Sequence, residues 1–272
     1  MDKYAIIGNP VKHSLSPKIH QLFGRQTEID FEYIKIEAPL YGFADIVFKF
    51  RDDGGKGCNI TIPFKSEAFA LATQVGDNAR LARAVNCFLF HEDNTIFGDN
   101  FDGIGLVEDL VNHHQYKISQ KKILIIGAGG ATQGIIAPLL EKAPSEIVVA
   151  NRTAEKAYAL AKQFAEKGPI TGIDLTALPN TPFDLIIHAT SLGHLNQLPH
   201  LPDGLISQNT FCYDLSYGLA AKPFLDWAQA QGAKEITDGI GMLVEQAAAT
   251  FYLWHGIYPD TKPVLASLRV HP

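Results

Sequence analysis

Apolar and polar residues follow two spacings along the chain, and these spacings predict where strands and helices alternate. Ile123–Ile126 is a continuous apolar run, which is typical of a strand buried on both faces. Apolar and polar residues alternate in Phe31–Ile36 and Cys58–Ile62, which favours strands with one polar face. Phe43–Phe50 is expected to form an amphipathic helix and Leu243–His255 a further helix. This alternation predicts an α/β protein.

A glycine-rich turn follows the apolar run Ile123–Ile126. Three glycines and an Ala/Leu-rich helix come next: Gly127, Gly129, Gly130 and Gly134–Lys142. Glycines let the backbone approach a pyrophosphate, and the N–H groups at a helix start point at it, so this context predicts a nucleotide site. Thr132 replaces the third glycine of the usual fingerprint, and a tight turn that binds nothing is the alternative.

The second half of the chain continues the alternation of strands and helices. Further strands are predicted at Glu146–Ala150, Pro169–Ile173, Phe183–His188, Thr210–Leu215 and Lys234–Thr237. We therefore expect a Rossmann-type, doubly wound parallel sheet domain over residues 102–239. Residues 1–101 are expected to form an N-terminal α/β domain, completed by C-terminal helices at about residues 240–272, with a cleft between the two domains. The pattern places no firm element in the tail from residue 260 to residue 272.

Composition and charge narrow the class of protein. The chain has 272 residues, a net charge of −6 and no basic stripe, so nucleic acid is not expected as a partner. Cys58, Cys87 and Cys212 lie far apart, which favours a reducing compartment without disulfides or zinc. Met1–Pro10 has no basic n-region before an apolar stretch, so we do not expect it to be a signal peptide, and no apolar run reaches membrane-spanning length. We expect a soluble cytoplasmic protein with no metal and no membrane partner.

Polar residues at predicted helix starts are candidates for binding and catalysis. Ser14 and Ser16 stand beside a helix start at Pro17, where two hydroxyls can hold a carboxylate; helix capping by Ser16 is the alternative. Lys65 opens the helix after Pro63, where the helix dipole disfavours a cation. A lysine in such a place suits proton transfer, although a surface lysine is the alternative.

Further candidates share the N-terminal domain. Asn59 and Thr61 lie on one strand face, which either lines a polar pocket or faces solvent. Asp102 either caps the helix that follows it, or binds a substrate hydroxyl, or holds Lys65 in position. Gln246, on the last long helix, is either a surface residue or reaches a pocket.

The strand Glu146–Ala150 ends in a motif that favours one cofactor over another. NAD enzymes usually carry an acidic residue at this strand end, but this chain has Asn151, Arg152 and Thr153, with Lys156 one helical turn further on. A guanidinium can hold a 2′-phosphate with two hydrogen bonds, whereas a carboxylate would repel it. The motif therefore predicts NADP(H). Helix capping is the alternative for Asn151 and Thr153.

A turn of small residues, Ala189–Ser191, follows the predicted strand Phe183–His188. A cofactor could pass close to the backbone there, which makes Thr190 a candidate cofactor residue. His188 and His194 flank the turn. Because no cysteine or carboxylate lies at ligand spacing, we interpret them as ordinary loop histidines and not as a metal pair.

Taken in their order along the chain, the motifs together resemble the shikimate dehydrogenase family. The resemblance rests on Gly8–Pro10, Ser14–Pro17, Asn59–Lys65, Ala84–Asn86, Gly98–Asn100, Asp102–Gly103, Gly127–Ala131, Asn151–Thr153, Gly241–Val244 and Gln246–Ala248. It covers nearly the whole chain. It implies an oxidoreductase with an N-terminal substrate-binding domain and an NADP-binding domain. The implied reaction is the reversible NADPH-dependent reduction of 3-dehydroshikimate to shikimate, a step of chorismate and aromatic amino acid biosynthesis.

The resemblance also implies roles for individual residues. Lys65, paired with Asp102, would move the proton. The substrate would be bound by Ser14 and Ser16 at its carboxylate and by Asn59, Thr61, Lys65, Asn86, Asp102, Tyr217 and Gln246 around its ring oxygens. With Thr190 from the turn above, the cofactor-binding set becomes Asp77, Gly127, Ala128, Gly129, Gly130, Ala131, Asn151, Arg152, Thr153, Lys156, Thr190, Leu215 and Gly239.

Four positions depart from what is common in the family. Phe101 stands in place of threonine, Lys156 of arginine, His188 of asparagine and Leu215 of methionine. Two other functions therefore stay open: a quinate/shikimate dehydrogenase paralogue with relaxed substrate or cofactor choice, and a non-catalytic NADP-binding sensor. Arg152 argues against an NAD-using paralogue. The oligomeric state is open between monomer and homodimer.

Overall fold

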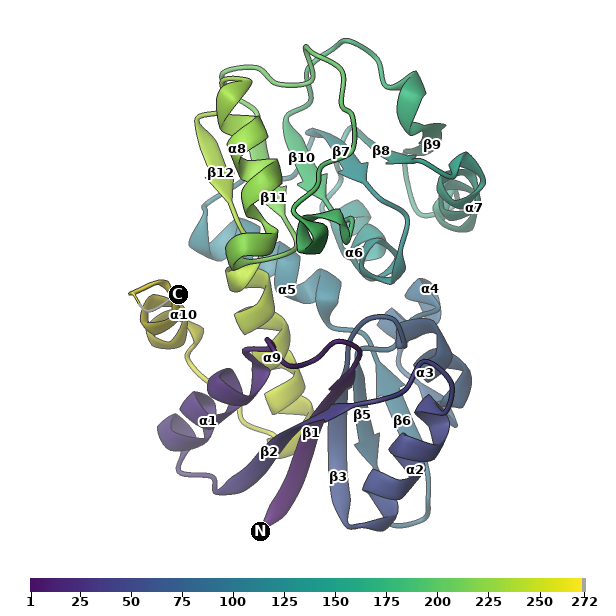
Figure 1. The fold of residues 1–272 in the computed structure, drawn as a ribbon, viewed down its shortest axis with the longest axis vertical. Coiled ribbons are helices and arrows are strands. Elements are labelled where there is room, and N and C mark those ends of the chain that lie inside the picture. Colours follow the sequence, from purple (N-terminus) through teal and green to yellow (C-terminus); the bar gives the residue numbers. More distant parts are fainter. Residues whose placement is uncertain (271–272) are drawn as a thin grey trace. The chain divides into compact units, whose positions relative to one another are not determined.

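The strands form two separate sheets in the computed structural model, which describes residues 1–270 (Figure 1). The chain divides into two units. Among the described residues, unit 1 comprises Met1–Gly105 and residues 243–270, and unit 2 comprises Leu106–Met242. The chain passes from unit 1 to unit 2 within helix α5 (Asp102–Glu108) and returns within helix α9 (Ile240–His255). Each unit combines helices with a sheet, which confirms the predicted α/β class.

Unit 1 contains a mixed sheet with the strand order β2-β1-β3-β5-β6-β4. Its strands are β1 (Asp2–Gly8), β2 (Phe31–Glu37), β3 (Gly55–Ile60), β4 (Gln74–Val75), β5 (Cys87–Phe90) and β6 (Ile96–Asp99). Strand β1 pairs in parallel with β2 and β3, whereas β5 runs antiparallel to β3 and β6. The carboxyl ends of β1 and β3 therefore point the same way.

Helices cover both faces of this sheet (Figure 1). They are α1 (Ser16–Thr27), α2 (Phe43–Asp52), α3 (Lys65–Leu71), α4 (Asp77–Ala82) and the C-terminal part of α9, while α10 (Thr261–Val270) contacts α1. Side chains of β1 alternate between two apolar clusters, as the two-residue repeat of a strand requires. Ala5 and Ile7 join the cluster that contains α2, whereas Tyr4 and Ile6 join the one that contacts Trp254 of α9.

Unit 2 contains an all-parallel sheet with the strand order β12-β11-β10-β7-β8-β9. Its strands are β7 (Lys122–Ile126), β8 (Glu146–Asn151), β9 (Ile170–Asp174), β10 (Leu185–His188), β11 (Phe211–Asp214) and β12 (Glu235–Thr237). From β7 the chain builds outward to β8 and β9, and then returns to the other side of β7 at β10. This reversal confirms the predicted doubly wound sheet and creates a switch point between β7 and β10.

The helices of unit 2 connect these strands. The α-helices are α6 (Gly130–Glu141), α7 (Ala154–Phe164) and α8 (Lys222–Ala230). Short 3₁₀ turns occur at η2 (Leu175–Ala177), η3 (Leu192–Leu195) and η4 (Gly218–Ala220), and one π-helical segment, η1 (Asp109–His113), follows α5. Parallel strands need such crossover connections, because each strand must begin again at the same edge.

The C-terminal tail differs from the expectation. Helix α10 occupies Thr261–Val270, where the sequence pattern placed no firm element, while residues 271 and 272 lie outside the described part of the chain. Val264, Leu265 and Leu268 are its buried residues, which is the spacing of one helical face. The Asp260 carboxylate accepts the Lys262 N–H at 3.1 Å, which caps the helix start.

Candidate active site

An ion pair between two helix starts lies at the centre of the unit 1 site. Lys65 is the first residue of α3 and Asp102 the first of α5. The Lys65 Nζ lies 2.5 Å from Asp102 Oδ2, and the two side chains are 13% and 6% exposed. A helix start favours the Asp102 carboxylate and opposes the Lys65 ammonium. The nearby carboxylate offsets that unfavourable dipole, and low exposure reduces screening by water.

Asn86 holds the other oxygen of the aspartate. Its Nδ2 donates to Asp102 Oδ1 at 2.9 Å and to Gln246 Oε1 at 3.4 Å, while its Oδ1 accepts the Phe101 N–H at 3.0 Å. Gln246 comes from α9, and its Nε2 donates to the Leu243 carbonyl. The structure therefore brings together Lys65, Asn86, Asp102 and Gln246, which lie far apart in the sequence.

The loop before Asp102 is fixed by side chains that the candidate set did not contain. Asn100 Oδ1 accepts the Asp102 N–H at 3.0 Å, and its Nδ2 donates to the Ala84 carbonyl at 3.0 Å. Asp99 Oδ1 accepts the N–H groups of Ala79 and Asn100 at 2.9 and 2.8 Å. Burial raises the pKa of Asp99 above its ordinary value, and these N–H donors oppose that shift. Asn100 and Asp99 thus orient the start of α5.

Asn59 is enclosed by hydrogen bonds to protein groups. It is 3% exposed; its Oδ1 accepts from the Tyr33 hydroxyl at 2.8 Å, and its Nδ2 donates to Thr250 Oγ1 at 3.1 Å and to the Asn86 carbonyl at 3.3 Å. Both amide hydrogens of Asn59 therefore have protein acceptors. Thr61 is half-buried directly after β3, and a Cβ on Gly8 would lie 2.2 Å from its Cγ2.

Tyr33 links this amide to the serine pair. Burial raises the pKa of its hydroxyl well above the ordinary value, and a hydrogen bond with Ser16 opposes the shift. The Tyr33 ring stacks on His20 with centroids 4.5 Å apart. Burial, with His255 nearby, lowers the pKa of His20 to about 3, so this ring is neutral at physiological pH. The sequence pattern offered no functional signal for Tyr33, because an aromatic residue in a strand is ordinary core.

The serine pair lies at the start of α1. The helix begins at Ser16 itself, Leu15 takes the capping position, and no side-chain cap is formed there. Ser14 Oγ lies 3.2 Å from Ser16 Oγ and accepts the Ser16 N–H at 3.2 Å. The alternative of Ser16 as the N-cap is therefore wrong, and the two hydroxyls lie side by side at the helix start, as a carboxylate site would require.

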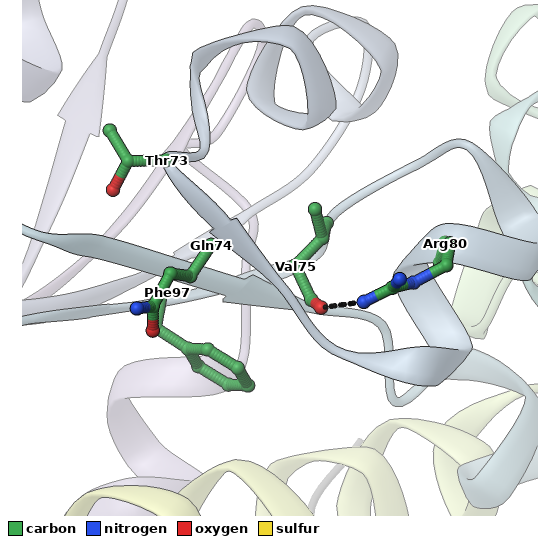
Figure 2. A pocket seen from close by; sticks show the side chains of 5 residues that line it. All are labelled: Thr73, Gln74, Val75, Arg80 and Phe97. Carbon is green, nitrogen blue, oxygen red and sulfur yellow. Dashed lines mark hydrogen bonds between the residues drawn. The ribbon is translucent and has the colours of Figure 1, made fainter.

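A shallow pocket elsewhere on unit 1 lies at the edge strand β4. Figure 2 shows its lining residues, Thr73, Gln74, Val75, Arg80 and Phe97. The Arg80 guanidinium donates to the Val75 carbonyl at 3.0 Å. None of these five residues belongs to the candidate set, and the one cation among them already bonds the backbone, so we assign no ligand to this pocket.

The glycine turn of unit 2 lies at the switch point. Gly127 has a φ of +117°, and a Cβ there would lie 2.9 Å from the Ala189 carbonyl oxygen, so only glycine fits this turn. A Cβ on Gly129 would meet nothing within 4 Å, which leaves open space at the start of α6. Thr132 Oγ1 donates to the Gly127 carbonyl at 2.9 Å, so the residue in place of the third glycine closes the turn. Gly130 and Ala131 belong to the first turn of α6, after Ala128.

The strand β8 ends at Asn151, whose Nδ2 donates to the Thr153 carbonyl at 2.9 Å. Thr153 occupies the capping position of α7 without forming a side-chain cap, so capping does not account for its hydroxyl. Arg152 and Lys156 are exposed. Two cations, one amide and one hydroxyl thus lie at the strand end where a ribose 2′-phosphate would lie in this class of fold.

The remaining candidates are found in three places. Asp77 is the exposed first residue of α4 in unit 1. Leu215 and Gly239 are neighbours in unit 2, since a Cβ on Gly239 would lie 2.3 Å from the Leu215 carbonyl oxygen. Tyr217 also belongs to unit 2, directly before η4, whereas the other substrate candidates belong to unit 1.

His188 is not a loop histidine, which corrects our expectation. It is the last residue of β10, it is 1% exposed, and its Nδ1 lies 2.8 Å from Asp214 Oδ2. Its Nε2 lies 2.7 Å from Thr190 Oγ1. His194 is exposed within η3. The described residues contain no group of three or more His, Cys, Asp and Glu side chains that could hold a metal ion.

An all-parallel sheet with a glycine turn at its switch point defines unit 2 as a Rossmann-type dinucleotide-binding fold. Family models match most of the chain: shikimate dehydrogenase substrate binding domain at residues 6–88, shikimate/quinate 5-dehydrogenase at residues 109–197, and shikimate 5′-dehydrogenase C-terminal domain at residues 239–269. The chain belongs to the shikimate dehydrogenase family, which confirms the resemblance seen in the motifs.

Individual relatives agree with this assignment. The chain is 57% identical over 271 residues to the shikimate dehydrogenase (NADP(+)) of Coxiella burnetii, with 100% of both chains covered. Among solved structures, the Ael1 enzyme from Pseudomonas putida has a TM-score of 0.89 at 41% identity and 98% coverage of both chains. Shikimate 5-dehydrogenase from Thermus thermophilus, in complex with NADP(H) and shikimate, has a TM-score of 0.85 at 30% identity and 99% coverage of both chains.

None of the helices in residues 1–270 combines the length and apolar character that a bilayer span requires.

Replacing Asn86 with alanine tests the hydrogen-bond network. Asn86→Ala leaves the buried Phe101 N–H and Asp102 Oδ1 without their partner, so we expect the free energy of unfolding to fall by about 1–3 kcal/mol. Urea denaturation measures this loss. Asn209→Ala, at an exposed loop position, is the control and should change stability by less than about 0.5 kcal/mol. Equal stabilities of the two variants would contradict the network.

Proposed function

We propose that this protein catalyses the reversible NADPH-dependent reduction of 3-dehydroshikimate to shikimate. The observation that carries the proposal is the Lys65–Asp102 ion pair, held at 2.5 Å and backed by Asn86. Family membership supports it, since the 57% identical Coxiella burnetii relative is a shikimate dehydrogenase (NADP(+)). The presence of both charged residues argues against a non-catalytic sensor.

Reduction of a ketone to an alcohol needs a hydride and a proton. Bound NADPH supplies the hydride to the carbonyl carbon. Lys65 Nζ donates the proton to the carbonyl oxygen, and in the reverse direction it takes the proton from the hydroxyl. Asp102 positions Nζ through Oδ2, while the hydrogen bond from Asn86 to Oδ1 fixes the orientation of the carboxylate. Lys65 and Asp102 are therefore the proposed catalytic residues.

We assign substrate binding mainly to unit 1. The Ser14 and Ser16 hydroxyls hold the carboxylate, because they lie together at the start of α1. Thr61, Asn86, Asp102 and Gln246 bind the ring oxygens. Asn59 belongs to the proposed set because its side-chain oxygen can still accept a hydrogen bond, although both of its amide hydrogens have protein acceptors. Tyr217, a residue of unit 2, is the remaining proposed substrate residue.

Unit 2 is proposed to bind NADP(H). The residues present fit the cofactor, because the open space at Gly129 and the uncapped start of α6 leave backbone donors for a pyrophosphate. Arg152 and Lys156 hold the 2′-phosphate, with Asn151 and Thr153 beside them. The remaining proposed cofactor residues are Asp77, Gly127, Ala128, Gly130, Ala131, Thr190, Leu215 and Gly239.

The setting of the reaction follows from the same observations. We propose that the protein acts in the cytoplasm, in chorismate and aromatic amino acid biosynthesis, as a monomer or homodimer without nucleic acid or membrane partners. The three cysteines are free and buried, which supports a reducing compartment. The net charge of −6 supports the absence of a nucleic acid partner.

The substrate and cofactor are tested by measuring NADPH or NADH absorbance with shikimate or quinate, each combined with NADP or NAD. We expect fast turnover only with shikimate and NADP. Comparable turnover of quinate or with NAD would show a paralogue of relaxed specificity. NADP binding without turnover in any combination would show a sensor and would direct attention to Phe101, which directly precedes Asp102 in the chain and packs with Cys87 and Ala249.

Lys65→Ala tests the proton-transfer role. We expect kcat to fall by about 10²–10⁴-fold, because a positioned general acid contributes that much. The dissociation constant of shikimate should change little, since the serines and amides that hold it remain. Lys56→Ala, at an exposed lysine of β3, is the control and should keep normal turnover. Near-normal kcat in Lys65→Ala would remove this lysine from the mechanism.

Arg152→Ala tests the 2′-phosphate assignment. The KM for NADP should rise by about 10–100-fold, because a hydrogen-bonded ion pair with the phosphate is lost, whereas weak use of NAD should be unchanged. Steady-state kinetics with both cofactors measure the difference. Lys162→Ala, an exposed cation on the same helix α7, should leave both KM values unchanged. Equal losses with NADP and NAD would contradict the assignment.

A further inference from the structure

Three side chains form a hydrogen-bonded series at the carboxyl ends of β10 and β11. Thr190 Oγ1 lies 2.7 Å from His188 Nε2, and His188 Nδ1 lies 2.8 Å from Asp214 Oδ2. His188 and Asp214 are 1% and 0% exposed, whereas Thr190 is half-buried. The His188 ring stacks on Phe224, with centroids 4.9 Å apart and planes 15° apart. The series therefore runs from a fully buried carboxylate to a hydroxyl that a ligand can reach.

The direction of these hydrogen bonds follows from the donors and acceptors present. A carboxylate only accepts, and the two Asp214 oxygens accept from His188 Nδ1 and from the Ser216 N–H at 2.7 Å. A neutral imidazole in this place carries its proton on Nδ1, and Nε2 is left as an acceptor. The Thr190 hydroxyl must then donate its only hydrogen to Nε2. Thr190 Oγ1 also accepts the Leu192 N–H at 3.4 Å, so it can offer a ligand its one remaining lone pair.

The position of Thr190 indicates which ligand group would meet it. Thr190 follows β10, and a Cβ on Gly127 would lie 3.2 Å from its methyl group, so it flanks the glycine turn at the switch point. Strand β8, which ends beside Arg152, lies on the other side of β7. If Arg152 holds the 2′-phosphate, the adenosine half lies over β8 and the nicotinamide half lies over β10.

We propose that His188 and Asp214 are positioning residues that make the Thr190 hydroxyl an acceptor for the nicotinamide half of NADP(H). The ligand group is a hydrogen-bond donor, a ribose hydroxyl or the carboxamide NH₂, and not a phosphate. The inference rests on the proposed function. It also gives a role to the histidine that stands where the family commonly has asparagine.

Thr190→Val tests the contact, because it removes the hydroxyl and keeps the shape. We expect the dissociation constant of NADPH, measured by fluorescence titration, to rise by about three- to tenfold. Binding of adenosine 2′,5′-bisphosphate, which lacks the nicotinamide half, should be unchanged. Thr190→Ser keeps the hydroxyl and should bind NADPH almost normally. Thr171→Val, at an exposed threonine of β9, is the matched control.

Asp214→Asn tests the relay itself. The asparagine side chain has one carbonyl oxygen, and the Ser216 N–H requires it as an acceptor. The asparagine NH₂ group therefore faces His188 Nδ1. The imidazole proton must then move to Nε2, which turns the Thr190 hydroxyl outward as a donor. We expect ¹⁵N NMR of the His188 ring to show the proton on Nε2 in this variant and on Nδ1 in the wild-type protein. NADPH binding should weaken, and adding Thr190→Val should weaken it no further.

The outcomes separate this inference from the proposed function. If wild-type protein binds neither NADPH nor the bisphosphate, the proposed function fails. If both bind but Thr190→Val leaves NADPH binding unchanged, or weakens binding of the two ligands equally, the relay is overturned and the proposed function stands. An unchanged His188 tautomer in folded Asp214→Asn would also overturn the relay. If that variant does not fold, the Val and Ser variants at Thr190 decide.

Discussion

The ion pair between Lys65 and Asp102 is the interaction on which the arrangement of unit 1 depends. Each residue begins a helix, so placing the pair fixes the start of both α3 and α5. A lysine at a helix start is unfavourable by itself, and a poorly exposed charge without a partner would be costly. The site therefore requires the carboxylate of Asp102, and the carboxylate in turn requires Asn86, Asn100 and the loop that Asp99 holds.

The polar residues around this pair form a continuous hydrogen-bonded path through a largely apolar unit. Asn86 connects Asp102 to Asn59 through its backbone carbonyl, and Tyr33 connects Asn59 to Ser16. Buried amides and hydroxyls of this kind are tolerated only when nearly all of their hydrogen bonds are made. The hydrogen bonds that keep this path stable also hold the groups that we propose to face a substrate in one orientation. Stability and preorganisation of the site thus have a common physical cause.

Unit 2 reaches a similar result by different means. Its parallel sheet brings strand ends together at one edge, and the reversal of strand order places the switch point at the carboxyl ends of the paired strands β7 and β10. Gly127 fits there because a side chain would collide with the Ala189 carbonyl. Beside it, the Asp214–His188–Thr190 series imposes one direction on a hydroxyl, which is a chemical preference that backbone donors alone do not provide.

Local pattern alone was sufficient for the α/β class, the strand Ile123–Ile126, the glycine turn and the candidacy of Lys65, because alternation, turns and helix starts are set by neighbours in the chain. The motifs in their order also indicated the family. Helix α10 also has a local signal, in the Asp260 cap and the spacing of Val264, Leu265 and Leu268, but the overall pattern of the tail predicts no firm element. The partners Tyr33 and Thr250, and the burial of His188 against Asp214, were decided only by the tertiary structure. Asn59 and Thr250 are 191 residues apart, and only folding brings such distant side chains within hydrogen-bonding distance.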